Sequence, residues 1–326
     1  MRDTVSAEAL SAFRNRLAKN AKHWGRWARR RGCGAYRVYA RDLPEFPLAL
    51  DCYVAEDPAL GTRVHLQEIE TGWEQDPAQH AAWLAAVTAA TAEALSLPAT
   101  AIVTKRRAKR QGREQHTKTG AAGHPFVVVE SGLRFLVNLE AYLDTGLFLD
   151  HRALRALVRE RAMGRRMLNL FAYTGSFTVY AAAGGAIASD TVDLSNTYLD
   201  WAAANFALNG VDVAKHALIR ADATSWLDAA RRERRRYDLV VLDPPAFSNS
   251  KAMSGVLDVQ RDHASLIAAA RALLAPGGEL FFSTNLRSFR LDAALAADAA
   301  VTDITARTLA EDFRDPRVHR AYRIAG

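Results

Sequence analysis

The chain has very little cysteine, with only Cys33 and Cys52 among its 326 residues. Two cysteines at this spacing fit neither a metal-binding motif nor a disulfide framework. The chain also has no run of about 18 apolar residues, which a membrane-spanning helix would need, and its N-terminus lacks the apolar segment of a secretory signal. We therefore expect a reduced, cytoplasmic protein with no membrane contact, and we assign no metal ligands.

Internal repeats and low-complexity segments are absent as well. The length suits one large or two ordinary domains, and 49% of the residues are apolar, enough for a sizeable core. Residues 35–105 mix short strands with one Ala-rich helix, whereas the pattern from residue 167 alternates strands and helices. We predict an α+β domain with a basic N-terminal helix over residues 1–140 and an α/β domain over residues 141–326.

Positive charge is concentrated in two stretches. Residues 1–41 contain eleven Lys and Arg against two acids, and residues 105–118 contain seven against one, although the net charge of the whole chain is only +7. The remainder of the chain is therefore acidic. Basic patches of this kind attract the phosphates of nucleic acids.

The first basic stretch predicts a helix over residues 7–31, because Phe13, Leu17, Trp24 and Trp27 recur at three- and four-residue steps. Two interpretations stay open and both can hold: an arm that lies along RNA phosphates, or a solvated helix whose Trp stripe packs on the body. The second stretch predicts a flexible RNA-contacting loop rather than a merely solvated one. The basic residues expected to contact RNA in the two stretches are Arg14, Arg16, Lys19, Lys22, Lys105, Arg106, Arg107, Lys109 and Arg110.

Residues 167–193 predict the start of a doubly wound parallel sheet. An apolar strand leads through a turn into an Ala-rich helix, which Gly184 and Gly185 close. The next strand ends on Asp193, whose carboxylate can accept both hydroxyls of a ribose. The turn holds Gly175, which permits a close backbone approach, but no second glycine for a pyrophosphate. This favours a nucleoside such as S-adenosylmethionine, although an ordinary βαβ unit with a capping Gly pair would look the same.

Two further strand ends carry carboxylates, Asp222 and Asp243. Ligands of such sheets bind beyond the carboxyl ends of the strands. Asp243 opens an Asp-Pro-Pro-x-Phe motif, in which Pro244 and Pro245 fix φ and remove two donors. The motif predicts a rigid shelf of carbonyls with one carboxylate, and Phe247 beside it to stack on a flat ring. The alternative is a Pro-rich turn after a strand.

These motifs resemble the guanine-N7 methyltransferases of 23S ribosomal RNA, which form the C-terminal half of a fused bifunctional large-subunit methyltransferase. The resemblance extends from about residue 10 to the end of the chain. The segments that carry it are Asn-Leu-Phe-x-Tyr-Thr-Gly at 169–175, Thr-Val-Asp-x-Ser at 191–195, Asp-Pro-Pro-x-Phe-Ser-Asn-Ser-Lys at 243–251, Asp-Val-Gln-Arg-Asp-His at 258–263, and residues 13–17, 36–39, 42–45 and 143–152.

The resemblance implies a Rossmann-like class I methyltransferase fold, S-adenosylmethionine as cofactor, and 23S rRNA or a large-subunit precursor as substrate. It also implies that residues 143–152 lie over the cofactor. An aromatic such as Phe148 is often core, however, and an Arg beside an Asp, as in Arg152, is often an ion pair; Asp150 is expected to cap the next helix. The residues expected to bind the cofactor are Phe148, Arg152, Asn169, Phe171, Thr174, Gly175, Ser176, Asp193, Ser195, Asp222, Ala223 and Asp243.

The chemistry at the shelf follows from what is missing there. Methylation of a pyrimidine C5 needs a cysteine nucleophile, and neither residues 243–247 nor residues 283–285 contain one. Guanine N7 needs no proton removed before attack, so alignment and exclusion of water suffice. The base must be unpaired or flipped out. We expect Asp243 to orient the guanine or the cofactor amine, Pro244 and Pro245 to set the height of the ring, and Phe247 to stack on it.

Two alternatives stay open. The shelf alone fits methylation of an exocyclic amine, guanine N2 or adenine N6, as well as it fits N7. A protein of another class, a non-catalytic RNA-binding factor in ribosome assembly, would keep the nucleoside fold without the activity. In the fused relatives a guanine-N2 methyltransferase precedes the part that this chain resembles. Substrate capture here would rest on the basic stretches, together with Lys251 and Arg287 near the RNA entrance, or on a separate guanine-N2 methyltransferase chain.

Overall fold

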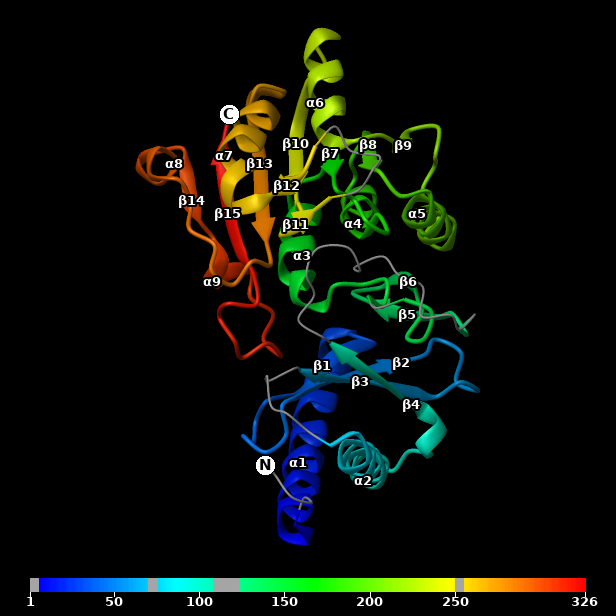
Figure 1. Ribbon diagram of the computed structural model, residues 1–326. Helices are drawn as coiled ribbons and strands as arrows, with labels where there is room; N and C mark the ends of the chain where they lie inside the picture. The colour runs from blue at the N-terminus through cyan, green and yellow to red at the C-terminus, as the bar shows by residue number, and fades with distance from the viewer. Residues whose placement is uncertain (1–5, 70–75, 108–122, 143, 250–254) are drawn as a thin grey trace. The chain divides into compact units, whose positions relative to one another are not determined.

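The computed structural model describes residues 6–69, 76–107, 123–142, 144–249 and 255–326, with only the backbone for residues 106 and 107. The contacts divide the chain into two compact units (Figure 1): the first ends at Thr145 and the second begins at Gly146. Each unit is built around its own sheet. None of the helices in the described part of the chain combines the length and the apolar character that crossing a bilayer requires.

The first unit begins with the predicted basic helix, α1 (Ala7–Arg31). The Ser6 side chain accepts a hydrogen bond from the N–H of Ala9 and caps the helix, and Gly32 ends it at φ 62°. Its apolar stripe is buried as predicted: Phe13 and Leu17 are fully buried, and Trp24 and Trp27 nearly so. The interpretation of a Trp stripe packed on the body is therefore confirmed.

The stripe of α1 packs on one face of a four-stranded sheet, on which α2 (Pro77–Leu95) also lies. The sheet order is β1-β2-β3-β4, with β3 and β4 parallel. A hairpin around Ser131 and Gly132 follows. The bounds in this unit are β1 (Ala35–Ala40), β2 (Leu48–Val54), β3 (Thr62–Ile69), η1 (Ala99–Ala101), β4 (Ile102–Arg107), β5 (Phe126–Glu130) and β6 (Leu133–Val137).

The second unit is built on a seven-stranded sheet of order β14-β15-β13-β10-β7-β8-β9. The chain runs outward from β7 through β8 to β9, then returns to the other side of β7 as β10 and β13; these five strands are parallel where they pair. The order therefore reverses at β7, where ligands of such sheets bind. The strands are β7 (Arg166–Leu170), β8 (Ala188–Asp193), β9 (His216–Arg220), β10 (Tyr237–Leu242), β13 (Leu274–Thr284), β14 (Val301–Asp303) and β15 (Arg320–Ala325).

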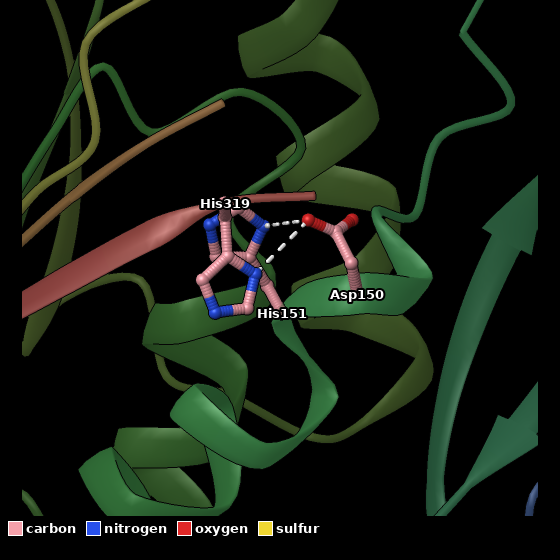
Figure 2. Close-up of side chains that lie close together, drawn as sticks. All are labelled: Asp150, His151 and His319. Carbon is pink, nitrogen blue, oxygen red and sulfur yellow. Dashed lines mark hydrogen bonds and ion pairs between the residues drawn. The ribbon is translucent and has the colours of Figure 1, made fainter. Parts of the chain in front are cut away.

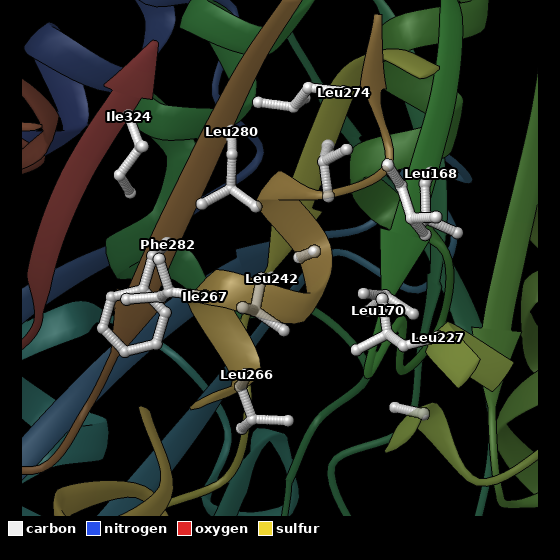
Figure 3. Close-up of a cluster of buried hydrophobic side chains, with 14 of the residues drawn as sticks. Leu168, Leu170, Leu227, Leu242, Leu266, Ile267, Leu274, Leu280, Phe282 and Ile324 are labelled. Carbon is white, nitrogen blue, oxygen red and sulfur yellow. The ribbon is translucent and has the colours of Figure 1, made fainter. Parts of the chain in front are cut away.

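Helices cover both faces of this sheet. On one face α6 and α7 pack on Leu168, Leu170, Leu242 and Phe282 (Figure 3); on the other, α3, α4 and residues near α9 form a second apolar cluster. The unit thus has the three layers of an α/β fold. Its remaining elements are η2 (Leu149–His151), α3 (Arg152–Glu160), α4 (Ser176–Ala183), α5 (Asn196–Leu208), α6 (Ala223–Arg232), β11 (Phe247–Ser248), β12 (Leu257–Asp258), α7 (Val259–Arg271), α8 (Ala293–Ala297) and α9 (Thr305–Thr308).

One local prediction was wrong. Asp150 does not cap α3: it lies inside the short 3₁₀ turn η2, and its carboxylate faces two histidines instead. The helix α7 begins at Val259. Its true cap is Asp258, whose carboxylate accepts hydrogen bonds from the N–H groups of Gln260 and Arg261.

Candidate active site

The loop that leaves β7 has an unusual backbone. Phe171, Tyr173 and Gly175 have φ values of 55°, 52° and 70°. Positive φ is costly for residues that carry a Cβ and persists only where the surroundings enforce it. Hydrogen bonds do so here: the N–H of Ala172 donates to the carbonyl of Val192, and the N–H of Gly175 donates to that of Ala172. The loop is therefore held open at the point where the strand order reverses.

Gly175 is required for a reason other than the one expected. A Cβ at this position would lie 3.0 Å from the Cβ of Ala202 and 3.0 Å from the ring of Phe206. Its missing side chain therefore points at α5 and not at a ligand. Glycine is needed for the positive φ and for the close packing of α5, and it places the N-terminus of α4, at Ser176, beside the loop.

Asp193 lies at the end of β8, beside the same loop. Its Oδ2 accepts a 2.8 Å hydrogen bond from the N–H of Tyr173, and its Oδ1 accepts one of 2.9 Å from the N–H of Ser195. These two hydrogen bonds hold the Asp193 carboxylate at the end of β8, beside the loop that leaves β7. The Ser195 hydroxyl accepts a hydrogen bond from the N–H of Tyr198 and caps α5.

Asp222 follows β9 and caps the next helix. Its carboxylate accepts hydrogen bonds from the N–H and the hydroxyl of Ser225, at 3.0 and 3.1 Å. Only Oδ1 is used in these contacts, so Oδ2 is available to a donor such as an amine. Ala223 begins α6 and is buried.

Residues 146–148 are tied to the loop after β7. The N–H of Gly146 donates to the hydroxyl of Tyr173, and the Thr174 hydroxyl donates to the Gly146 carbonyl at 2.7 Å. The ring of Phe148 lies 4.9 Å from that of Tyr173. Buried Arg155 holds the carbonyl of Phe148 at 2.7 Å. Phe148 is thus placed beside the predicted cofactor loop.

Two residues expected at the cofactor serve the protein itself. Asn169 is buried and donates to the hydroxyl of Thr178 on α4 at 3.1 Å, so it fixes that helix on the sheet. Its neighbours Leu168 and Leu170 face the opposite side, as strand alternation requires. Arg152 is also buried, and its guanidinium pairs with Asp312 at 2.7 Å. The alternative of an ion pair therefore describes Arg152, which pairs with Asp312 on a distant part of the chain.

Asp243 stands at the end of β10, next to the end of β13. The register pairs Leu242 with Phe282, so the residues that follow are neighbours, and the Ser283 hydroxyl donates to Asp243 Oδ1 at 2.7 Å. About 20% of the Asp243 side chain is exposed. Phe247, 40% exposed, begins the two-residue strand β11. An exposed aromatic thus stands close in sequence to a partly accessible carboxylate.

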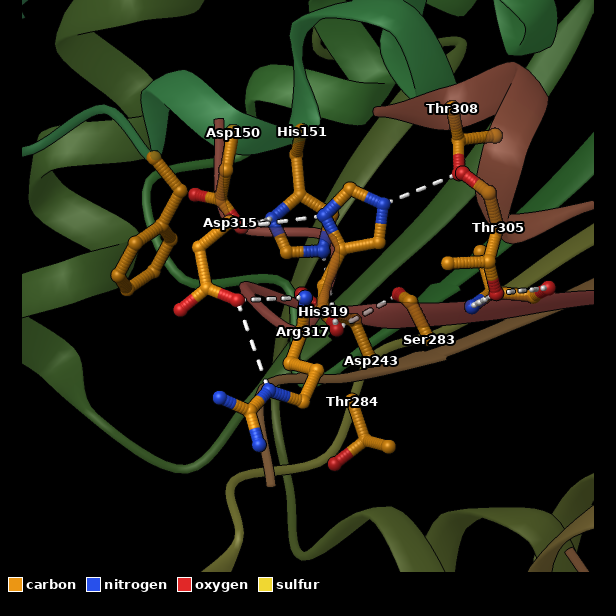
Figure 4. A network of polar contacts seen from close by, with 12 residues as sticks. Asp150, His151, Asp243, Ser283, Thr284, Thr305, Thr308, Asp315, Arg317 and His319 are labelled. Atoms are coloured by element: carbon orange, nitrogen blue, oxygen red, sulfur yellow. Dashed lines mark hydrogen bonds and ion pairs between the residues drawn. The ribbon is translucent and has the colours of Figure 1, made fainter. Parts of the chain in front are cut away.

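A pair of histidines lies behind Asp243. The Nε2 of His151 is 3.5 Å from Asp243 Oδ1, and its Nδ1 is 3.5 Å from Asp150 Oδ2. The Nδ1 of His319 lies 3.3 Å from the same oxygen of Asp150 (Figure 2), and its Nε2 contacts the Thr308 hydroxyl at 3.0 Å. The network thus runs from Ser283 through Asp243, His151, Asp150 and His319 to Thr308 (Figure 4).

The charges in this network shift its proton affinities. Burial lowers the pKa of His151, but the neighbouring carboxylates of Asp243 and Asp150 outweigh this and raise it to about 9. Burial raises the pKa of Asp243. The charge of His151 and the hydrogen bond from Ser283 outweigh this effect, so the pKa lies below its ordinary value. Both shifts favour an ionised Asp243 carboxylate that faces an imidazolium.

Comparison with known proteins agrees with this geometry. A family model described as S-adenosylmethionine-dependent methyltransferase matches residues 75–308. A Neisseria meningitidis serogroup B protein named ribosomal RNA large subunit methyltransferase K is 53% identical over 315 residues, which cover 97% of this chain and 87% of that protein. The chain belongs to the ribosomal RNA large subunit methyltransferase K family. Its cofactor is S-adenosylmethionine, as the motifs predicted.

Other members of this methyltransferase family are longer. A Methylococcus capsulatus protein named ribosomal RNA large subunit methyltransferase K/L is 50% identical over 99% of this chain, which spans only 43% of that relative. Among solved structures, the SMU.776 methyltransferase complexed with SAH aligns with a TM-score of 0.75 at 24% identity, over 99% of this chain and 83% of that one. This likeness confirms the predicted methyltransferase fold.

The basic residues expected at RNA fall into different settings. Arg16, Lys19 and Lys22 are exposed on α1, whereas Arg14 pairs with Glu93 at 2.6 Å. The ammonium of Lys105 donates to the Tyr142 carbonyl; burial lowers its pKa to about 8, against the opposing charges of nearby acids. Arg287 pairs with Asp315 at 2.6 Å. The backbone of Arg106 and Arg107 continues β4. The other three positions, Lys109, Arg110 and Lys251, lie outside the described residues.

Sequence reasoning missed the two histidines of this methyltransferase site. His151 lies inside a segment that carries the family resemblance, but its neighbour Asp150 was interpreted only as a helix cap. The spacing of Asp150 and His151 is a weak signal, because adjacent polar residues are common at helix starts. His319 gives no local signal at all: the fold of β15 brings it to a residue far away in the sequence.

Proposed function

We propose that this methyltransferase transfers a methyl group to N7 of a guanosine in 23S ribosomal RNA. The names of its relatives support a large-subunit rRNA substrate, and the motifs that resemble the guanine-N7 enzymes support the position. The observation that carries the choice of N7 is the setting of the Asp243 carboxylate, whose Oδ1 accepts a 2.7 Å hydrogen bond from the Ser283 hydroxyl and lies 3.5 Å from His151 Nε2. A ribosomal substrate would also agree with the cytoplasmic location that we expect.

The state of Asp243 matters because the two candidate reactions make different demands. Attack by N7 leaves a positive charge on the purine ring and releases no proton at that step. A fixed carboxylate next to the ring would stabilise this developing charge. Methylation of an exocyclic amine instead requires a proton to leave, and a carboxylate whose pKa is lowered is a weaker proton acceptor than an ordinary one. The site therefore favours N7 over guanine N2 or adenine N6.

The residues around the loop after β7 fit the cofactor. Asp193 would accept the ribose hydroxyls, and Asp222, with Ala223, would meet the adenine. Phe148 and Phe171 would cover the nucleoside, while Thr174, Gly175 and Ser176 present the N-terminus of α4. Bound S-adenosylmethionine supplies an electrophilic methyl group on its sulfonium.

The residues after β10 would hold the base. Pro244 and Pro245 present carbonyls without N–H groups, Phe247 would stack on the flipped guanine, and Asp243 would orient it. Because N7 is already nucleophilic, these residues act by alignment. Orientation of this kind lowers reaction barriers by roughly 7–11 kcal/mol in favourable systems.

RNA capture would begin on α1. Its exposed basic residues recur at three- and four-residue steps and so form a stripe along one side of the helix. Such a stripe suits the phosphates of an RNA backbone. The residues are Arg16, Lys19, Lys22, Arg26, Arg29 and Arg30. A separate guanine-N2 methyltransferase chain as partner stays a prediction.

The proposal is tested by methyl transfer from S-adenosylmethionine to unmodified 23S rRNA, followed by borohydride–aniline cleavage, which cuts the chain at N7-methylguanosine. We expect one new cut, lost in Asp243→Ala. The matched control is Asp238→Ala, since the Asp238 carboxylate accepts a hydrogen bond from the N–H of Arg166 and lies at the other end of β10. Methyl incorporation without a cut would point to an exocyclic amine, and absence of S-adenosylmethionine binding would contradict the whole proposal.

A further inference from the structure

The network behind Asp243 contains a side chain that the reaction, as described so far, does not use. His151 is only 4% exposed, and neither of its ring nitrogens has a hydrogen-bond partner within normal distance. Its two nearest polar contacts are carboxylates, each at 3.5 Å. Burial of an imidazole without hydrogen-bond partners costs free energy. The fold therefore keeps His151 in place at the expense of stability.

The surroundings of His151 define its charge. Asp150 faces it from η2 and Asp243 from the end of β10. The His319 ring stacks on it with centroids 5.1 Å apart, and the Arg155 guanidinium on α3 opposes its charge. The remaining close neighbours are the rings of Phe148 and Phe177. Two anions against one cation favour a protonated His151.

Asp150, His151 and His319 also lie close enough to suggest a metal ion. Their orientation argues against one. The two imidazole planes are inclined by only 19° and are stacked. A metal ion binds in the plane of each ring, on the lone pair of its nitrogen, and two stacked rings have no such point in common. Ion pairing explains the cluster better.

We propose that His151 is a positioning residue, a buried cation that holds Asp243 Oδ1 together with Ser283 and leaves Oδ2 to the target base. Asp150, held in turn by His319, fixes the His151 ring from the other side. The Asp243 side chain is about 20% exposed and that of His151 about 5%, so the carboxylate can meet a base whereas the imidazole cannot. This inference rests on the proposed role of Asp243.

The first test needs no RNA. We label histidine with ¹⁵N and follow the nine imidazoles by NMR as a function of pH, assigning His151 by its loss in His151→Gln. In the wild-type protein His151 should titrate near pH 9, and in Asp243→Asn its midpoint should fall. A midpoint near the ordinary value of 6.5 in the wild type would overturn the proposal. If His151→Gln fails to fold, triple-resonance experiments can assign the His151 imidazole instead.

The second test measures turnover. We expect His151→Gln to lower kcat by roughly 10- to 100-fold, as misplacement of an aligning group does, with little change in the affinity for S-adenosylmethionine. The control is His216→Gln, which removes another buried histidine, bonded to Ser189 at 2.9 Å. Unchanged kcat in a folded His151→Gln variant would contradict the inference. If His151 titrates near pH 9 but no N7-methylguanosine forms, the proposed function is wrong and this inference stands. If N7-methylguanosine forms but the pKa of His151 has its ordinary value, only this inference is wrong.

Discussion

The main-chain N–H of Tyr173 donates a hydrogen bond of 2.8 Å to Oδ2 of Asp193. Tyr173 belongs to the loop after β7 and has a positive φ, whereas Asp193 ends the neighbouring strand. The other oxygen of the same carboxylate accepts the N–H of Ser195. One side chain therefore fixes both backbone segments that border the proposed cofactor site.

Replacement of Asp193 should affect both binding and stability. In Asp193→Ala the two N–H groups lose their acceptor, and we expect the free energy of unfolding to fall by about 1–3 kcal/mol. The affinity for S-adenosylmethionine should fall roughly 10- to 100-fold, since a hydrogen bond to a charged group contributes about 1.5–3 kcal/mol. Calorimetric titration and chemical denaturation measure the two effects. The control is Asp238→Ala, away from the loop, which should lose stability but keep its affinity for S-adenosylmethionine. If Asp193→Ala binds S-adenosylmethionine as tightly as the wild type does, Asp193 does not bind the cofactor.

Gly175 and Gly210 offer a matched pair. Both have positive φ, 70° and 64°, but a Cβ at Gly210 would meet nothing within 4 Å, whereas one at Gly175 would press on Ala202 and Phe206. Gly210→Ala should therefore cost about 1–2 kcal/mol of stability, the left-handed penalty alone. Gly175→Ala should cost more, because α5 must shift. Urea denaturation of both variants compares them, and equal losses would show that the packing on α5 adds nothing.

Glu279 should make the stability of the protein depend on acid. Burial raises the pKa of this carboxyl, but hydrogen bonds from Arg161, Arg323 and Arg165 lower it, and the net shift is downward from 4.5. A group with a lowered folded pKa stabilises the protein above its ordinary pKa and loses that contribution as pH falls through the folded value. Glu279→Gln should therefore cost about 1.5–3 kcal/mol at pH 7. The difference from wild type should shrink below about pH 4, as thermal unfolding across pH would show; a constant difference would exclude this linkage.

The stripe on α1 should set the salt dependence of RNA binding. Lys19→Glu and Lys22→Glu should each weaken binding and reduce the slope of log affinity against log salt by roughly one. Filter binding to an rRNA fragment over a range of salt concentrations measures this slope. Lys215→Glu, an exposed charge reversal in the second unit, serves as control. If all three variants weaken binding equally, the effect would reflect net charge and not a site on α1.

The sequence predicted the strand ends well because two simple periodicities determine them. Apolar runs place β7 and β10 in the centre of a parallel sheet, and parallel strands bring their carboxyl ends to one edge. The same logic gives the direction of Asn169: it alternates with Leu168 and Leu170, which pack on the α6–α7 side, so its side chain faces α4.

The histidines could not be predicted in this way. The contact between His319 and Asp150 depends on an antiparallel strand added beside β13 after the parallel part of the sheet is complete. Neither residue lies in a periodic pattern that specifies the other. Similarly, the charge of the N-terminal helix was evident, but only the structure separates Arg14, which pairs with Glu93, from the exposed Arg16.

β15 lies between β13 and β14 and is hydrogen-bonded to both. It is the last strand of the chain, yet His319, which precedes it directly, reaches Asp150 at the start of the same unit. During synthesis, the support behind Asp243 therefore cannot form until residues 319–325 have left the ribosome. A nascent or shortened chain could contain every motif of the cofactor site and still lack a rigidly held Asp243, so activity would report that the whole unit has folded.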